Sequence, residues 1–261
     1  MVSTIDGQMH HFNNVGLYDA LFVMQDTETK TLWNHITGEA LYGPLVGRTL
    51  GPVGNVLQMN VKQALVLDGD LRAAISDRAY FAGGRQFGTA PAIGSGRGPA
   101  PGRGGAPGGA AAGRGPGPGR GGAGPNPNAA LSEMFVQTLG QEDTRRPRMD
   151  MGLGVWTGST RRYYPMELIR QRGEALIDEI EGRKVLVYVD PDTFTPAAVF
   201  VNSATARLQN KEVRLDNGQV LQGGVLFLRG GRRVEVERPQ QVFTRWYGFA
   251  LTFPGADVFG Q

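Results

Sequence analysis

The sequence predicts a β-rich α+β protein, built from two related, mainly antiparallel modules with short helices and separated by a disordered insert. Short apolar runs alternate with turn-forming pairs such as Thr37-Gly38 and Asn217-Gly218, which is the pattern of antiparallel hairpins. Helical spacing of apolar residues is confined to short stretches. Glycine and proline dominate residues 88–130, which separate a first module at 1–87 from a second at 131–261.

The first module is expected to be a meander of short strands. The apolar run at 21–24 predicts a buried strand, and Asp26–Thr29 predicts a turn whose aspartate bonds backbone amides two residues on. Thr31–Asn34 and Glu39–Tyr42 are the next extended segments. Asn55 is then expected to cap a short helix that carries Val56, Leu57, Val61, Ala64 and Leu65.

The insert contains little that could stabilise a fold. Gly94–Gly124 alone holds 15 glycines, and Ile93 is the only large apolar residue between 88 and 130. Ordering a residue costs roughly 1–2 kcal/mol of conformational entropy, which such a composition does not offset. The segment is therefore predicted to be disordered.

The second module is expected to open with a strand and a short helix. Gly152–Tyr164 has the pattern of a strand with a turn at Gly158. Pro165 at the first helical position and Gly173 at the C-terminal cap bracket the helix.

Hairpins and one more helix complete the predicted second module. Lys184–Val189 and Ala197–Val201 are strands joined by a turn at Asp190–Thr193, and two further hairpins follow. Their turns lie at Asn217-Gly218 and Gly230-Gly231. A last helix is predicted over residues 240–253, opened by Pro239 and ended by Pro254.

The formal charge of +3 comes from the insert and its flanks. No acidic residue lies between Asp77 and Glu133, and without the six arginines of that gap 21 basic residues remain against 24 acidic ones. The sequence pI of about 9.3 therefore does not indicate a basic folded surface. The chain has no cysteine, so thiolate chemistry is excluded, and no signal peptide or membrane span is recognisable.

Residues 19–50, DALFVMQDTETKTLWNHITGEALYGPLVGRTL, resemble the bacterial domain-of-unknown-function family numbered 3179. The second half resembles the family in Tyr164-Pro165, in Asp178 and Gly182, and in the segment FTRWYGFALTFPGADVF at 243–259. The positions that match the family's first motif are Asp26, Thr29, Trp33, Thr37, Gly38, Glu39, Ala40, Gly43, Pro44, Leu45 and Gly47.

The resemblance implies tandem modules, and the chain departs from that pattern twice. Family members open each module with a Tyr-Pro helix and a strand pair, and the first pair commonly carries Cys-Pro-Leu-Cys. This chain begins at Ile5-Asp6-Gly7, partway through such a module, so the resemblance implies either an N-terminally truncated chain or a reduced form. The later module has Asp216-Asn217-Gly218 where the threonine–tryptophan motif is expected. The resemblance implies no activity.

Asp26, His35 and Glu39 are the candidate catalytic residues, around a cleft beside Trp33. His35 and Glu39 are four residues apart, but Thr37-Gly38 lies between them, so the helical zinc-binding spacing does not apply. On a bent hairpin they could still form a general acid–base pair. The alternative is an exposed histidine and a glutamate that bonds a turn amide, which we prefer.

We expect neither a metal nor another cofactor. His10, His11 and His35 could ligate zinc or copper. Adjacent residues on a strand point to opposite faces, so only one of the first two could join such a site. The chain also lacks cysteine ligands and a spaced carboxylate cluster.

A ligand site is the remaining candidate on the modules. Trp33, Trp246 and Tyr247 could form an aromatic platform for a sugar or peptide, with Thr37 and Tyr164 as further candidate contacts. Large aromatic residues are more often core residues that need one partner for a polar atom, and we prefer that interpretation.

Arg103-Gly-Gly105 and Arg120-Gly-Gly122 resemble nucleic-acid-binding Arg-Gly-Gly segments. No aromatic residue lies between Phe87 and Phe135 to stack on bases, and the charge density is low. We therefore interpret the tract as a tether and expect no nucleic-acid partner.

Three functions stay open at this point. The preferred one is a non-catalytic binding or scaffold module, used outside the cytoplasm in full-length relatives. The alternatives are a hydrolase- or oxidoreductase-like enzyme at Asp26, His35 and Glu39, and an RNA-associated protein acting through the arginine–glycine tract. The partner is an unknown ligand or protein, and an exposed edge strand predicts self-association.

Overall fold

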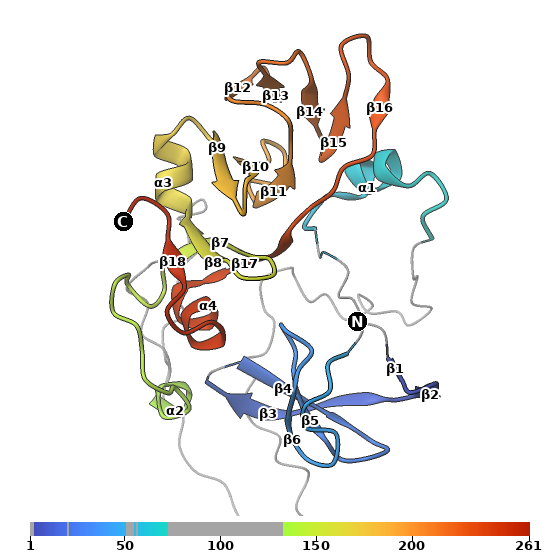
Figure 1. Ribbon diagram of the computed structural model, residues 1–261, viewed down its shortest axis with the longest axis vertical. Coiled ribbons are helices and arrows are strands. Elements are labelled where there is room, and N and C mark those ends of the chain that lie inside the picture. The colour runs from blue at the N-terminus through green and yellow to red at the C-terminus, as the bar shows by residue number, and fades with distance from the viewer. Residues whose placement is uncertain (1–2, 20, 51–54, 56, 73–132) are drawn as a thin grey trace, which may run out of the picture. The chain divides into compact units, whose positions relative to one another are not determined.

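The computed structural model describes residues 3–19, 21–50, 55, 57–72 and 133–261 (Figure 1). Antiparallel sheets and short helices confirm the β-rich α+β class. The predicted insert at 88–130 and its boundaries lie outside the described residues. The described residues 3–70 and 133–261 group into one compact unit, which is separate from a second unit that begins at Leu71. Every helix and strand named below belongs to the first unit.

The predicted N-terminal meander is present, with an additional strand before it. Its strands pair antiparallel in chain order: β3 (Phe12–Tyr18), β4 (Leu21–Asp26), β5 (Leu32–Asn34) and β6 (Ala40–Tyr42). A short pair, β1 (Thr4–Ile5) and β2 (Gln8–Met9), precedes them. Ile5, Trp33 and Leu50 form the core of this region.

The core contacts β4 through Met24, which is half-buried. The run at 21–24 forms a strand as predicted, but it is not a fully buried one, because Val23 is buried and Phe22 is 48% exposed. Leu21 and Met24 are half-buried, so neither face of the run is fully covered.

The helix after the meander begins five residues later than predicted. α1 spans Val61–Leu67, and its N-cap is Asn60, not Asn55. The Asn60 side chain accepts from the Gln63 amide while the Gln63 side chain accepts from the Asn60 amide, a reciprocal capping box. Asn55 and Asn60 are each followed three residues later by a glutamine, Gln58 and Gln63, so the capping-box pattern alone does not distinguish them.

Strands distant in the sequence form the sheet on which the C-terminal helix packs. β7 (Met151–Trp156) pairs antiparallel with β8 (Arg161–Pro165) and with β17 (Gln240–Arg245), and β18 (Asp257–Val258) adds in parallel to β8. The hairpin between β7 and β8 is the one predicted at Gly158. Helix α3 (Met166–Gln171) follows directly. Pro165 was predicted as its first helical residue but is its N-cap, so the helix begins one residue later.

The prediction of a helix over residues 240–253 is wrong for its first half. Residues 240–245 are β17, which pairs with β7 along its whole length. Val242, Phe243 and Thr244 are strongly strand-forming, and Pro239 sits where a strand can begin without a donor. Helix α4 spans only Trp246–Thr252, and its first amides donate to the carbonyls of Asp150 and Arg148.

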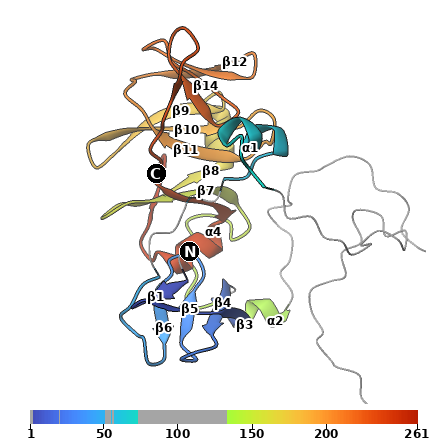
Figure 2. The ribbon, with the colours of Figure 1, turned by 90° about the vertical axis from the view of Figure 1, so that its right-hand side faces the viewer.

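The remaining sheets consist of local hairpins. β9 (Ala175–Ile180), β10 (Arg183–Val189) and β11 (Pro196–Phe200) lie side by side (Figure 2). The second group pairs in chain order, through the predicted turns at Asn217-Gly218 and Gly230-Gly231. It comprises β12 (Ala206–Gln209), β13 (Glu212–Leu215), β14 (Val220–Gln222), β15 (Val225–Phe227) and β16 (Arg233–Val234). One further short helix, α2, spans Glu133–Val136 and precedes β7 in the chain.

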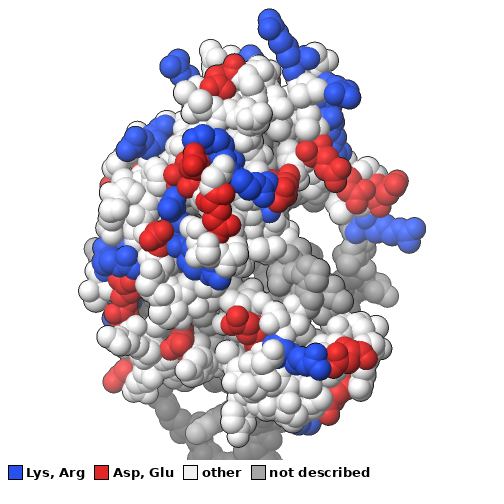
Figure 3. Space-filling model, viewed as in Figure 1, with Lys and Arg blue, Asp and Glu red and all other residues white. Residues whose placement is uncertain are grey.

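The charged side chains on the face drawn in Figure 3 alternate in sign, with no large area of one sign. This agrees with the inference that the folded surface is not basic. Among the described helices, none is both long and apolar enough to cross a membrane. Within the described residues β3 borders its sheet on one side and β6 on the other, and self-association through such an edge stays a prediction.

Candidate functional site

Asp26 is the centre of the turn that the sequence predicts. Its side chain is fully buried, and its Oδ1 accepts the Thr29 amide at 2.5 Å and the Thr29 hydroxyl at 2.8 Å. Its Oδ2 accepts the Trp33 indole N–H at 2.8 Å. The carboxylate therefore closes the turn between β4 and β5 and supplies the one polar partner that the buried tryptophan requires.

These donors determine the charge state of Asp26. Burial alone would raise the pKa of the Asp26 carboxyl, because it disfavours the charged form. Hydrogen bonds from Trp33 and Thr29, with the nearby His10 imidazole, outweigh burial and lower the pKa to about 2. Asp26 is thus an ionised structural group at neutral pH, with its oxygens already bonded.

The three candidate catalytic residues are not brought together. His35 donates from Nδ1 to the Phe22 carbonyl at 2.7 Å, and burial, opposed by this bond, lowers the pKa of its imidazole. Glu39 is exposed and accepts the Thr37 hydroxyl at 3.3 Å. His35 lines a pocket with Ile36, whereas Glu39 lines a separate hollow with other residues. Asp26 is buried away from both, beside Trp33.

The candidate ligand contacts are mostly core residues. Trp33, Tyr164 and Trp246 are each fully buried. The Tyr164 hydroxyl donates to Asp178 at 2.8 Å and the Trp246 indole N–H donates to the Asp143 carbonyl at 2.7 Å. Each aromatic residue thus has the single polar partner that the core interpretation requires, and their side chains offer no exposed platform.

A second turn repeats the main hydrogen bonds of the first. Asp190 accepts the Thr193 amide at 2.9 Å and the Thr193 hydroxyl at 3.1 Å, and Thr193 and Thr195 share a hydroxyl bond, as Thr29 and Thr31 do. Both turns follow the pattern Asp-x-acid-Thr-x-Thr. Their fifth residues, Lys30 and Phe194, have positive φ of 64° and 56°.

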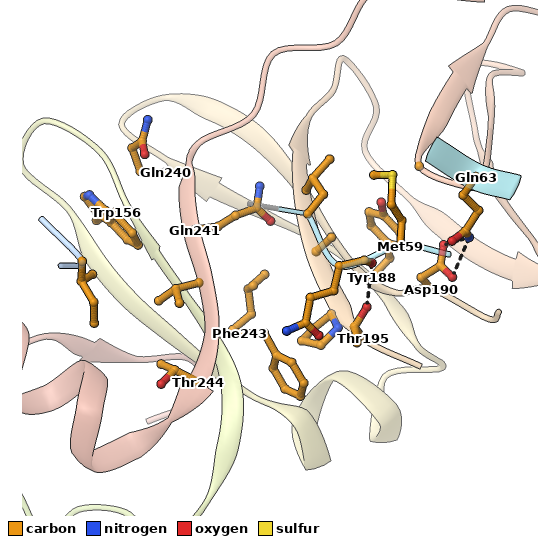
Figure 4. Close-up of a pocket in the computed structure, with 18 of the residues that line it drawn as sticks. Met59, Gln63, Trp156, Tyr188, Asp190, Thr195, Gln240, Gln241, Phe243 and Thr244 are labelled. Carbon is orange, nitrogen blue, oxygen red and sulfur yellow. Dashed lines mark hydrogen bonds between the residues drawn. The ribbon is translucent and has the colours of Figure 1, made fainter. Parts of the chain in front are cut away.

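The two turns differ in the distant side chain that donates a hydrogen bond to their buried aspartate. Asp26 accepts the indole N–H of Trp33, which lies in the same sheet. Both Asp190 oxygens accept the side-chain amide of Gln63 from α1 at 3.1 Å (Figure 4). Gln63 and Asp190 are each 6% exposed. Together with the Thr195 hydroxyl donating to the Gln58 carbonyl, this contact docks the segment around α1 on the β10–β11 hairpin.

A pocket of about 280 Å³ lies beside this contact. Its walls come from the segment before α1, the β10–β11 hairpin, the β14–β15 turn, β7 and β17, with Leu21, His35 and Ile36 from the N-terminal sheet. Apolar side chains predominate, among them Leu57, Met59, Tyr188, Ala197 and Phe243 (Figure 4). Of the sequence-predicted site residues, His35 is the one that lines it.

Sequence reasoning missed Gln63, Asp190 and Tyr188 as pocket residues. The repeated Asp-x-acid-Thr-x-Thr pattern could have identified Asp190 as the counterpart of Asp26. No local signal connects Gln63 to it, because 126 other residues separate the two in the chain.

Gln63→Glu is expected to release α1 from the hairpin. The substitution places a second carboxylate against buried Asp190, and like charges in a buried contact cost about 2 kcal/mol or more. Hydrogen exchange of the full chain should show faster exchange at residues 57–67. Lys62→Gln, which makes the same change in net charge on the exposed side of α1, should leave that exchange unchanged. Equal exchange in both variants would contradict the docking role of Gln63.

No family model, no curated protein and no solved structure matches the chain.

Proposed function

We propose that the chain is a non-catalytic binding module whose ligand site is the pocket beside α1. The observation that carries the proposal is the pocket itself, whose volume of about 280 Å³ approaches the ~300–1,000 Å³ of sites for small molecules. Such sites are mostly apolar with a few fixed polar groups. Tyr188, Met59 and Phe243 supply the apolar part here, and the Gln63–Asp190 pair lies at the wall.

The polar groups of the wall indicate the kind of ligand. The Gln241 side chain accepts from the Ala198 amide at 2.6 Å and donates to the Ala198 carbonyl at 3.0 Å. Gln63 and Asp190 bond each other, and Thr195 bonds Gln58. Since these groups are engaged within the protein, recognition would depend mainly on apolar contact. The proposed ligand is therefore a small, largely apolar molecule.

The placement of the charged candidates favours binding over catalysis. A general acid–base pair needs both groups within hydrogen-bond reach of one substrate. His35 and Glu39 line different hollows, and the carboxylate of Asp26 is held by Thr29 and Trp33, away from the pocket. The arginine–glycine tract on which an RNA-associated function would depend lies outside the described residues. Membership of the tandem-module family stays a prediction.

Filling the pocket is expected to weaken the binding of an apolar probe. Ala197 lines the pocket, and Ala197→Leu adds three carbon atoms to its wall. We expect the variant to bind anilinonaphthalene sulfonate at least tenfold more weakly than the unchanged protein, measured by fluorescence titration of the full chain.

Ala204→Leu is the matched control, because Ala204 is exposed and lies outside the pocket lining. It should bind the probe as the unchanged protein does. Circular dichroism and the unfolding midpoint establish that both variants are folded. Equal probe binding by a folded Ala197→Leu variant would place the probe elsewhere and contradict the proposal.

A further inference from the structure

His10, Asp26 and Glu28 bring three metal-ligating side chains together in the N-terminal sheet. Their ligand atoms all lie within 4.8 Å of one another. The two carboxylates come from the turn between β4 and β5, and His10 from the segment before β3. The backbone bonds Thr27 N to His11 O at 2.8 Å and His10 N to Ser3 O at 2.7 Å fix these segments independently of the His10 ring.

The His10 ring has an unmet hydrogen-bonding requirement. The side chain is 4% exposed, and within the described residues its Nδ1 has no hydrogen-bond partner. The nearest carboxylate oxygens lie at 3.5 Å on Asp26 and 3.9 Å on Glu28. These distances exceed the ~2.7–3.2 Å of N–H···O bonds. A buried polar atom without a partner is rare in folded proteins and requires an explanation, of which a bound ion is one.

The spacing suits a cation between the three groups. Zinc forms bonds of about 2.0–2.2 Å to imidazole nitrogen and carboxylate oxygen in a tetrahedral arrangement, which places two ligand atoms roughly 3.4 Å apart. The 3.5 Å between His10 Nδ1 and the Asp26 oxygen is close to that separation. Glu28 is partly exposed, and its Oε2 lies 3.9 Å from the same nitrogen.

Each carboxylate is held by other protein groups while facing His10. Asp26 Oδ1 is the oxygen nearest His10 and also accepts the Thr29 amide and hydroxyl, while Oδ2 accepts the Trp33 indole. Glu28 Oε2 is the oxygen nearest His10 and also accepts the His11 amide at 2.9 Å, while Oε1 is bonded to the His11 ring at 2.7 Å. Outer partners of this kind orient metal ligands and are part of functional metal sites.

We propose that His10, Asp26 and Glu28 bind a divalent transition-metal cation of the zinc class. The mixed imidazole and carboxylate donor set suits zinc or manganese better than calcium, which takes oxygen ligands. Three protein ligands leave one position of a tetrahedral ion for water or a small anion. The site is separate from the pocket beside α1 and does not depend on the function proposed for it.

The second turn provides an internal comparison. Asp190 and Asp192 occupy the positions that Asp26 and Glu28 have in the first turn, but their partners are the Gln63 amide and the Lys211 ammonium at 3.0 Å. An ammonium is a hydrogen-bond donor without a free lone pair, so Lys211 cannot serve as a third metal ligand there. The inference therefore applies to the first turn, and the second turn supplies a control.

Zinc binding by the full chain tests the proposal. Isothermal titration with zinc chloride should show one ion bound per chain. Glu28→Gln and His10→Gln should each weaken binding at least tenfold, whereas Asp192→Asn and His35→Gln should leave it unchanged. Glu28→Gln is the more informative variant if His10→Gln fails to fold, because the Glu28 side chain is partly exposed.

A local optical signal distinguishes this site from adventitious surface binding. Cobalt(II) bound between these residues would lie next to Asp26, the hydrogen-bond partner of Trp33, and should quench the fluorescence of Trp33. The quenching should disappear in Trp33→Phe and persist in Trp246→Phe. Absence of stoichiometric zinc binding by the folded protein would overturn the proposal. So would binding that survives in both His10→Gln and Glu28→Gln.

Discussion

Gly154→Ala is expected to destabilise the fold by about 3 kcal/mol or more. Gly154 lies in the middle of β7, and an added Cβ would come within 2.2 Å of Cδ2 and 2.3 Å of Cε2 of Phe249. Phe249 is fully buried in the cluster with Tyr163 and Trp246, so its ring has no free volume to enter. Neither the strand backbone nor the ring can move without breaking the contact between β7 and α4.

Gly158→Ala is the control for this substitution. Gly158 lies in the turn after β7, and its closest approach to an added Cβ is a Glu181 oxygen at 4.0 Å. Its unfolding free energy in urea should change by less than about 1 kcal/mol. Adding Phe249→Leu to Gly154→Ala should recover part of the loss, because the shorter side chain vacates the space. A stability of Gly154→Ala equal to that of Gly158→Ala would show that the sheet and helix are not packed as described.

Asp26→Asn is expected to cost about 2–4 kcal/mol in the N-terminal sheet. The substitution removes the charge that the Thr29 and Trp33 hydrogen bonds stabilise, and it places an NH₂ group where one of these donors already points. The effect is measured as the unfolding free energy in urea, with the fluorescence of Trp33 reporting the loss of its burial. Glu39→Gln, at an exposed carboxylate of the same sheet, should change stability by no more than about 0.5 kcal/mol.

The stability difference between Asp26→Asn and the unchanged protein should also depend on pH. The pKa of Asp26 is lowered from 3.8 to about 2 in the folded state, so its contribution to stability is complete above pH 3.8 and is lost as the pH falls toward 2. The Asp26→Asn protein lacks this contribution at every pH. The stability difference between it and the unchanged protein should therefore shrink across that interval. A constant difference would contradict the assignment of an ionised Asp26.

Local rules predicted much of the fold. The Asp26–Thr29 turn, the hairpin at Asn217-Gly218 and the hairpin at Gly230-Gly231 follow from residues adjacent in the chain, because side-chain caps and positive φ angles are set within a few residues. These features required no knowledge of tertiary contacts. The choice between Asn55 and Asn60 did not follow from the same rules, because a glutamine stands three residues after each, and the structure forms the capping box at Asn60.

The errors arose where distant segments decide the outcome. Residues 240–245 contain strand-forming residues, but the helix after them was extended back to Pro239, and their pairing with the distant β7 ends it at Trp246. The family resemblance sets Asp216-Asn217-Gly218 where the threonine–tryptophan motif is expected, whereas hydrogen bonds matching those of the first turn occur at Asp190. Gln63 reaches Asp190 from far away in the sequence. Contacts of this kind depend on packing that composition and spacing do not encode.

The sheet of β17, β7, β8 and β18 has a consequence for how quickly the protein reaches its native state. The pairing of β17 with β7 joins Trp156 to Gln240, so every hairpin from β9 to β16 lies inside the loop that this pairing closes. Pairings of high sequence separation form slowly because the entropy of loop closure precedes the gain from contact. During synthesis the inner hairpins emerge from the ribosome before β17 does, so β7 is paired with β8 on one side while its other edge stays open in the interval.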